Sequence, residues 1–427
     1  MLRLVFEENH FVLWTYLICG NFDLNMLVEH KLGNVRYFGT KLRGRSSRST
    51  LKLGLICAGL GAVAGTGYTY YVAQYRQPIA IGNKELQTSP VLESFPNVTI
   101  SRQVAGVGDN SGLKLMLFQY PTCPFCCKVR AFLDYFGLSY DVVEVDPVLR
   151  QEIKWSQYKK VPILVVQLEE GYQQLNDSSM IISCLASFLN DPRQNLKDVV
   201  KYYPKMEFKD DDGSVKSEVL NRYFLMFQEV PTGRTTENLV QERKWRKWAD
   251  DKLVHVLSPN VYQTPNEALQ AFNWFSEVGE WDKNFPVWER NLIVYVGAYA
   301  MWIIGKRLKK RHNLKENVRL SLYDECNHWV RTLRKQGTAF LGGDSPNLAD
   351  LAVYGVLGSI EGCLAFRDIL ANTSIGPWYS RMKESVGSHA GSSVIGRSAP
   401  YSPGFILIGP QDPNVNRRPN IIAYSSD

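Results

Sequence analysis

The sequence predicts an α/β domain at residues 113–190, followed by an all-α domain. Three observations support this division. The chain has 427 residues, too many for one core. Residues 113–190 alternate short apolar runs, typical of strands, with helical periodicity. Beyond residue 240 the apolar residues recur at helical spacing. We divide the chain into a basic leader 1–52, a candidate membrane span 53–73, a linker 74–112, the α/β domain 113–190, a connecting segment 191–240, the helical domain 241–385 and a disordered tail 386–427.

The N-terminal part has the composition of a leader and anchor. The net charge of the chain is +7, and no Asp or Glu occurs at residues 30–84, where Lys and Arg recur. Residues 53–73 carry no charge and are long enough to span a bilayer as a transmembrane helix. The alternative is a buried core helix, but the flanking charges and the glycines favour membrane insertion. We see no basic and aromatic pattern of an RNA-binding protein, so no nucleic-acid partner is expected.

Two strands and a helix are predicted at the start of the α/β domain. Residues 114–120 form an apolar strand, and Pro121-Thr122 a turn. A helix begins at about Pro124 and ends at Gly137, and residues 140–145 form the second strand.

The second half of this domain completes a known order of elements. A polar amphipathic segment is followed by a strand at 162–166, a strand or turn at 172–175, and a helix after 176–178. The resulting order, β-α-β-α-β-β-α, is that of a thioredoxin-like domain.

The rest of the chain is predicted to be a loop and then helices. We expect a loop at 190–220, around Lys209-Asp-Asp-Asp-Gly213. The residues of one later helix share an apolar face: Trp245, Trp248, Ala249, Leu253 and Val256. Residues 292–304 are too short to span a membrane and are predicted to be a buried helix, which a basic run at 306–311 ends.

The strongest chemical signal is Tyr120-Pro-Thr-Cys123-Pro-Phe-Cys126. Cys123 lies between a strand and a helix, where free N–H groups and the helix dipole favour the thiolate. Pro124 suits the first helical position. Cys126 lies on the same face and can resolve a disulfide at Cys123. Cys127 points about 100° further around the helix, so we expect it to be packed and unreactive.

Other interpretations of this motif are less consistent with the sequence. Of the eight Cys residues only these three cluster, which is typical of a reducing compartment with one reactive thiol site. Structural zinc needs two further ligands, yet there is no second CxxC and the six His are scattered. Haem attachment needs His where Cys127 stands. Two incidental buried cysteines would not explain the strand–CPxC–helix context.

Two further motifs suggest a peptide-like ligand. A cis Val161–Pro162 bond opposite the thiol would present the Val161 backbone to an extended peptide. Asp177 and Ser178 precede a helix, where they serve as an N-cap or as a carboxylate site, and the two roles are compatible.

Together, these motifs resemble the N-terminal domain of a glutaredoxin or glutathione transferase. The resemblance implies that Val161 (with Pro162), Asp177 and Ser178 hold glutathione, and residues 347–353 resemble the transferase helical domain's buried capping box. Three strings are more narrowly similar to the membrane-associated prostaglandin E synthase type 2 family: CPFCCKVRAFLDYFGLSYDVVEVDP, KWRKWADDKLVH and PNLADLAVYGVLGSIEG. This likeness covers roughly residues 113–385.

This second resemblance implies a specific reaction, isomerisation of prostaglandin H2 to prostaglandin E2. Cys123 would be the essential thiol, Tyr120 would orient it or donate a hydrogen bond, and Phe125 would line the hydrophobic pocket. The family also implies glutathione, haem with the Cys123 thiolate as its axial ligand, and a homodimer.

The family resemblance and the distribution of basic residues predict different locations for the catalytic domain. Basic residues before the span predict a lumenal enzyme, whereas the family implies a Golgi or endomembrane anchor with the catalytic domain facing the cytosol. The acid-free, Ser-rich leader leaves a mitochondrial alternative. Two other functions remain open: a glutathione-dependent thiol oxidoreductase or transferase, and a non-enzymatic protein that binds glutathione or haem.

Overall fold

The computed structural model describes residues 89–397, apart from 107, 148, 192–194, 210–214 and 227–234. The predicted leader and the candidate membrane span 53–73 lie outside the described residues, as does the end of the predicted tail. The fold itself continues beyond the expected boundary at 385. Helix α14 (Gly376–Gly387) and a 3₁₀ turn (Ser392–Arg397) follow, and the Gly391 N–H donates to the Tyr135 carbonyl oxygen at 3.0 Å.

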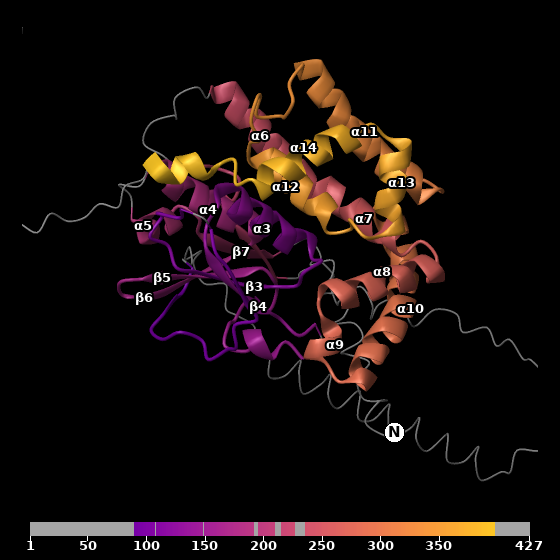
Figure 1. Cartoon of the computed structure of the whole chain (residues 1–427), viewed down its shortest axis with the longest axis horizontal. Coiled ribbons are helices and arrows are strands. Elements are labelled where there is room, and N and C mark those ends of the chain that lie inside the picture. The colour runs from indigo at the N-terminus through magenta and orange to yellow at the C-terminus, as the bar shows by residue number, and fades with distance from the viewer. Residues whose placement is uncertain are drawn as a thin grey trace, which may run out of the picture.

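A six-stranded mixed sheet forms the α/β domain, with the order β1-β6-β5-β3-β4-β2 (Figure 1). Its central strands β3 and β4 are parallel, and the other pairs are antiparallel. The strands are β1 (Val91–Leu92), β2 (Arg102–Val104), β3 (Leu115–Gln119), β4 (Tyr140–Glu144), β5 (Ile163–Leu168) and β6 (Gly171–Asn176). The predicted strands are therefore confirmed, and 172–175 is a strand rather than a turn.

Helix α3 (Pro124–Phe136) joins β3 to β4 as predicted. Pro124 occupies its first turn, and Gly137 ends it in the left-handed conformation, φ 66°. The second helix expected between β4 and β5 is absent from the described structure. Only a 3₁₀ turn at Gln151–Ile153 occurs there, and the left-handed φ of 50° at Arg150 keeps this turn from extending toward the N-terminus.

The sheet is covered differently on its two faces because residues alternate along each strand. Leu115 and Leu117 face α3 and α4 (Ser178–Asn190), in a core that continues into the helical domain. Met116 and Phe118 face a smaller cluster that also contains Cys123 and Cys126. Figure 1 shows α3 and α4 between the sheet and helices of the C-terminal half. Cys123 thus lies on the sheet's thinly covered side.

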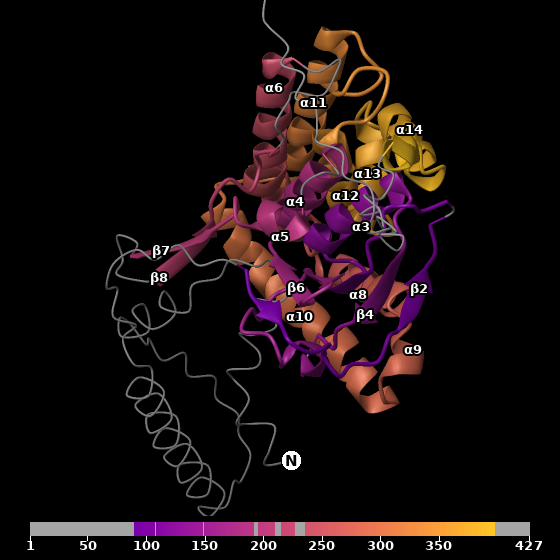
Figure 2. The ribbon, with the colours of Figure 1, turned by 90° about the vertical axis from the view of Figure 1, so that its left-hand side faces the viewer.

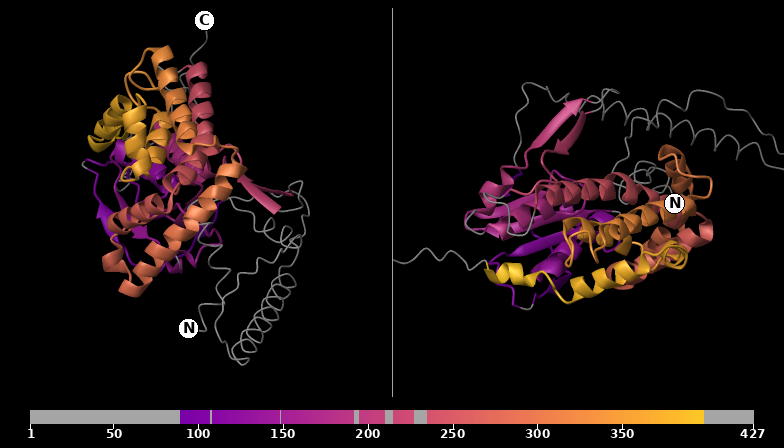
Figure 3. Two further views of the ribbon diagram at one scale, coloured as in Figure 1. Left: turned by 90° about the vertical axis from the view of Figure 1, so that its right-hand side faces the viewer. Right: turned by 90° about the horizontal axis from the view of Figure 1, so that it is seen from above.

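The prediction of a loop at residues 190–220 is wrong. Helix α5 (Leu196–Val200) begins after Asn195, whose side chain accepts from the Lys197 N–H. Strands β7 (Lys205–Lys209) and β8 (Val215–Val219) then pair in an antiparallel hairpin that projects from the body (Figures 2 and 3). Apart from Lys209, the acidic run around which this loop was predicted lies outside the described residues.

In the helical domain, a π-helical turn separates two of the helices, and a capping box starts another. Trp245, Ala249, Leu253 and Val256 are buried as predicted, and Trp248 is half-buried. Ahead of α12, Asn347 and Asp350 form the predicted capping box. The elements are α6 (Thr236–Trp248), a π-helical turn (Ala249–Leu253), α7 (Val254–Val261), α8 (Pro265–Val278), α9 (Trp281–Asn284), α10 (Val287–Arg311), α11 (Val318–Gln336), α12 (Leu348–Gly358), α13 (Leu364–Asn372) and α14.

Helix α10 differs from the predicted buried helix. One face is buried through Ile293, Ala298 and Met301, but Trp288, Tyr295 and Tyr299 are 58–69% exposed. The run 292–304 therefore belongs to a longer helix with an apolar face on each side. Within the described part of the chain, no helix combines the length and apolar character needed to cross a membrane.

The two domains meet most closely where α3 crosses α12. Gly355 of α12 lies against the α3 backbone, and a Cβ at this position would come within 2.6 Å of the Lys128 Cα and 2.7 Å of its nitrogen. Such a distance cannot be accommodated without separating the helices.

We expect Gly355→Ala to destabilise the protein by about 1–3 kcal/mol, the usual cost of overpacking. Gly358→Ala is the matched control, since a Cβ there meets only the Tyr379 hydroxyl at 3.5 Å. Thermal unfolding followed by circular dichroism measures both. Equal melting temperatures for the two variants would contradict the close approach.

Candidate active site

Cys123 is the N-cap residue of α3 and is only 6% exposed. Hydrogen bonds from the Cys126 thiol lower the pKa of Cys123, and the backbone N–H groups of Cys126 and Phe125 lower it further, against the effect of burial. The structure therefore places Cys123 where the sequence predicted, with donors that stabilise its thiolate.

The two neighbouring cysteines differ from Cys123, because burial raises the pKa of both. Burial, followed by the Cys123 side chain, raises the pKa of Cys126, which leaves it a neutral donor to Cys123. Burial also raises the pKa of Cys127. The Cys127 thiol donates to the Pro121 carbonyl oxygen at 3.3 Å and accepts from Arg130 at 3.1 Å. Cys127 is thus packed, in the way predicted.

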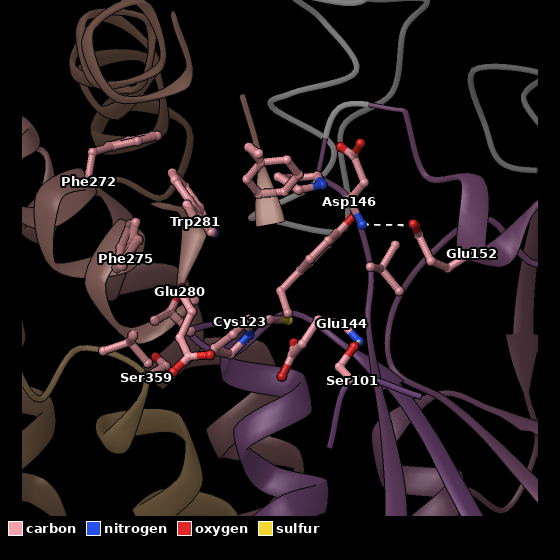
Figure 4. Close-up of a pocket in the computed structure, with 18 of the residues that line it drawn as sticks. Ser101, Cys123, Glu144, Asp146, Glu152, Phe272, Phe275, Glu280, Trp281 and Ser359 are labelled. Carbon is pink, nitrogen blue, oxygen red and sulfur yellow. Dashed lines mark hydrogen bonds between the residues drawn. The ribbon is translucent and has the colours of Figure 1, made fainter. Parts of the chain in front are cut away.

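A cavity of about 840 Å³ opens beside Cys123, between the domains. Figure 4 shows Phe272, Phe275 and Trp281 on one side, Glu144, Asp146 and Glu152 on the other, and Cys123 between them. The helical side is apolar and also contains Val254, Leu257 and Val261 of α7. An apolar wall of this kind, facing an activated thiol, suits a hydrophobic substrate.

Sequence reasoning missed the helical wall and the acidic side of this cavity. Its aromatic residues have ordinary core periodicity, and nothing local shows that they line a cavity rather than a core. The carboxylates come from three places in the chain, which are residues 144–152, Glu280 and Glu289. Only tertiary structure brings these groups together.

Of the predicted pocket residues, Tyr120 lines the cavity and Phe125 does not. Tyr120 follows β3, and burial raises the pKa of its phenol, which stays a neutral donor. Phe125 is half-buried and contacts both cores, with the Lys128 ammonium 5.6 Å from its ring centre. Phe125 therefore supports α3 instead of facing this cavity.

A second group of predicted residues lies away from the cavity lining. The Val161–Pro162 bond is cis, as expected. Asp177 caps α4, with one oxygen accepting from the N–H groups of Ser179 and Met180 at 2.9 and 3.1 Å. Tyr158 interacts electrostatically both with Asp177 of this group and with Cys123. Burial raises the pKa of Tyr158, and the charges of Asp177 and Cys123 raise it further.

A buried polar network links α3 and α4 to the helical domain. The Lys128 ammonium donates to Asp250 in the π-helical turn, and to the Ser179 hydroxyl at 3.0 Å. Asp250 also accepts from Ser179 and Tyr223, at 2.6 and 3.0 Å. Burial alone would raise the pKa of Asp250, but Lys128 and these hydrogen bonds hold it below its usual value. No local sequence signal indicates this network.

Comparison with known proteins decides the family. Residues 115–169 match the family model described as Glutaredoxin, which confirms the predicted fold of this domain. Prostaglandin E synthase 2 of Mus musculus is 49% identical over 288 residues, which cover 67% of this chain and 73% of that protein. The chain belongs to the prostaglandin E synthase 2 family. The protein of the same name from Danio rerio is 48% identical over 278 residues, 64% of this chain and 72% of its own length.

Solved structures also match a large part of this chain. A glutathione transferase from Populus trichocarpa covers 67% of this chain and 99% of its own, at 13% identity and a TM-score of 0.35. Among the residues that the structure describes, no three His, Cys, Asp or Glu side chains are grouped to hold a metal ion.

We expect Cys126→Ala to raise the pKa of Cys123, because the thiol donor that contributes most to lowering it is lost. The midpoint of Cys123 alkylation by iodoacetamide, followed by peptide mass spectrometry, should move to higher pH. Cys127→Ala is the control, since Cys127 bonds Pro121 and Arg130 instead. An unchanged midpoint in Cys126→Ala would contradict the assignment of Cys126 as donor.

Proposed function

We propose that this chain is an isomerase that converts prostaglandin H2 to prostaglandin E2 through Cys123. Its membership of the prostaglandin E synthase 2 family supports this reaction. The observation that carries the proposal is an activated thiol open to a cavity with an apolar wall. That combination suits a fatty-acid-derived endoperoxide.

The proposed chemistry conserves every atom of the substrate. The Cys123 thiolate attacks one endoperoxide oxygen, the O–O bond breaks, and the other oxygen takes a proton to become a hydroxyl. A base then removes the proton from the ring carbon that bears the sulfur-bound oxygen. The ketone forms as the S–O bond breaks and the thiolate leaves. Neutral Tyr120 can donate a hydrogen bond to the oxygen on which charge develops.

Glutathione is the proposed second ligand, held by Val161 next to Pro162, by Asp177 and by Ser178. The glutaredoxin match supports it. These residues lie outside the cavity lining, so glutathione and the lipid would occupy different sides of Cys123.

Haem fits the described cavity poorly, although the family resemblance implies it with Cys123 as axial ligand. The cavity lining contains five carboxylates, Glu144, Asp146, Glu152, Glu280 and Glu289, and a single Arg or Lys, Arg102. Two haem propionates would need two positive partners, and this lining supplies only Arg102.

A thiol oxidoreductase acting with glutathione is the second candidate. The hydrogen bond between Cys126 and Cys123 supports it, since two thiols in contact can close a disulfide. The two reactions differ in their need for Cys126. A dithiol cycle requires it as the resolving thiol, whereas an isomerase uses it only as a donor to Cys123.

We expect Cys123→Ser to abolish prostaglandin E2 formation above the spontaneous rate, because serine supplies no thiolate. Cys126→Ser should keep much of the activity, since its hydroxyl still donates to Cys123. Chromatographic analysis of products from prostaglandin H2 measures both, with Cys127→Ser as the matched control. Equal loss in Cys123→Ser and Cys126→Ser would favour the dithiol oxidoreductase. Spontaneous rates in every variant would refute the isomerase.

Membrane attachment through residues 53–73 is also proposed, with the catalytic domain facing the cytosol from a Golgi or endomembrane surface. The uncharged run supports the anchor, and the acid-free leader keeps a mitochondrial location as the alternative. Protease protection in isolated organelles distinguishes these orientations.

A homodimer through the exposed face of α10 is the proposed assembly. Its apolar side chains form one stripe, which includes Trp288, Leu292, Tyr295 and Tyr299. An antiparallel pair of α10 helices would place the basic end at 306–311 beside the acidic start of the partner helix. Charge complementarity and apolar burial would then act together.

We expect the double variant Trp288→Glu/Tyr295→Glu to be monomeric, because two carboxylates would be buried in that interface. Leu320→Glu/Leu370→Glu is the control, since these leucines are also exposed but lie on α11 and α13. Analytical ultracentrifugation measures the mass of each. A monomeric wild type, or a dimeric Trp288→Glu/Tyr295→Glu protein, would contradict this interface.

A further inference from the structure

Arg222 lies over the N-terminus of α4, although it is far from the glutaredoxin match in sequence. Its guanidinium is 3.3 Å from the second carboxylate oxygen of Asp177 and 3.3 Å from Glu218. The side chain is 23% exposed, and its buried Nε has no hydrogen-bond partner in the described part of the chain. Arg222 thus retains a donor beside a site predicted to bind a ligand.

The turn that carries Arg222 is fixed at several points. The Arg222 carbonyl oxygen accepts from the Ser183 hydroxyl of α4 at 2.6 Å. The next residue, Tyr223, accepts from Arg246 through its carbonyl oxygen and donates to Asp250 through its hydroxyl. On the other side, the Asn221 amide donates to the Tyr202 carbonyl oxygen. Arg222 is therefore positioned relative to α4 before any ligand arrives.

Ser178 supplies further donors at the same place. It is the first residue of α4 and is 4% exposed. Neither its N–H nor its hydroxyl has a hydrogen bond within the residues that the structure describes, whereas the N–H groups of Ser179 and Met180 are taken by Asp177. With the Arg222 guanidinium, these donors and the positive end of the helix form a cradle for a carboxylate.

The Asp177 carboxylate is the hydrogen-bond acceptor in this cluster, and it makes the site more selective for its ligand. One Asp177 oxygen caps α4, and the other faces Arg222, where it could instead accept from an ammonium group. A γ-glutamyl group has an α-carboxylate and an α-ammonium on one carbon, so it matches a guanidinium and a carboxylate placed 3.3 Å apart. Inserting this zwitterion would exchange one ion pair for two.

We propose that Arg222 recognises the α-carboxylate of the γ-glutamyl group of glutathione and so selects this tripeptide over shorter thiols. This inference rests on the proposed glutathione site and adds its specificity residue. Arg222 does not line the lipid cavity. The residue therefore governs glutathione affinity and not entry of the lipid.

Isothermal titration with glutathione and with cysteinylglycine tests the assignment in the full chain. Arg222→Ala should weaken glutathione binding roughly 10- to 100-fold, as expected for a lost hydrogen bond between charged groups. Arg222→Lys should recover part of this loss because it keeps the charge. Cysteinylglycine lacks the γ-glutamyl group, so its affinity should be the same in wild type and in both variants.

Arg243→Ala is the matched control, since Arg243 stacks 4.2 Å from the Phe224 ring centre, close to the same turn, without an ion pair to Asp177. Its glutathione affinity should equal that of wild type. Unchanged glutathione affinity in Arg222→Ala would overturn the inference, as would a parallel loss for cysteinylglycine. Wild type that binds no glutathione would instead refute the proposed cofactor site and, with it, the role of Arg222.

Discussion

The buried ion pair between Lys128 and Asp250 is the contact on which the geometry of both proposed ligand sites depends. Lys128 follows Cys126 by two residues on α3, and Asp250 lies in the π-helical turn of the helical domain. Removing either partner would leave a charge buried without compensation, at a cost of about 3–5 kcal/mol. The pair therefore fixes the orientation of α3, and with it Cys123, relative to the opposite wall of the cavity.

The π-helical turn explains how one carboxylate reaches so many partners. An extra residue in a helical turn redirects the side chains around it, and such turns occur often at functional sites. Here Asp250 reaches Lys128 of α3, Ser179 of α4 and Tyr223 beside Arg222. Asp250 thus holds together α3, the start of α4 and the turn that carries Arg222. The helix that carries Cys123 and the polar cluster at the start of α4 are therefore joined by one hydrogen-bond network.

Signals within a few residues of each other predicted much of this fold. The strand–Cys123–Pro124 order, the Gly137 cap and the Val161–Pro162 pair all act locally, and the structure has each where it was expected. Local patterns failed where partners are distant in sequence. Strands β7 and β8 are stabilised by pairing with each other, and Arg222 reaches Asp177 only in the folded chain. For α10, periodicity detected an apolar helix but could not tell a buried face from an exposed one.

The acidic side of the cavity is less negative than its residues suggest. Burial raises the pKa of Glu144, and nearby Glu280 raises it further, while burial also raises the pKa of Glu289. Arg102 pairs with Glu144 at 3.2 Å and is about half exposed, so a positive group stands on this side of the cavity. A fatty-acid carboxylate is therefore repelled least near Arg102. With its charged end there, the apolar body of such a molecule would lie along α7 and α8, and its ring could reach Cys123 between the two walls.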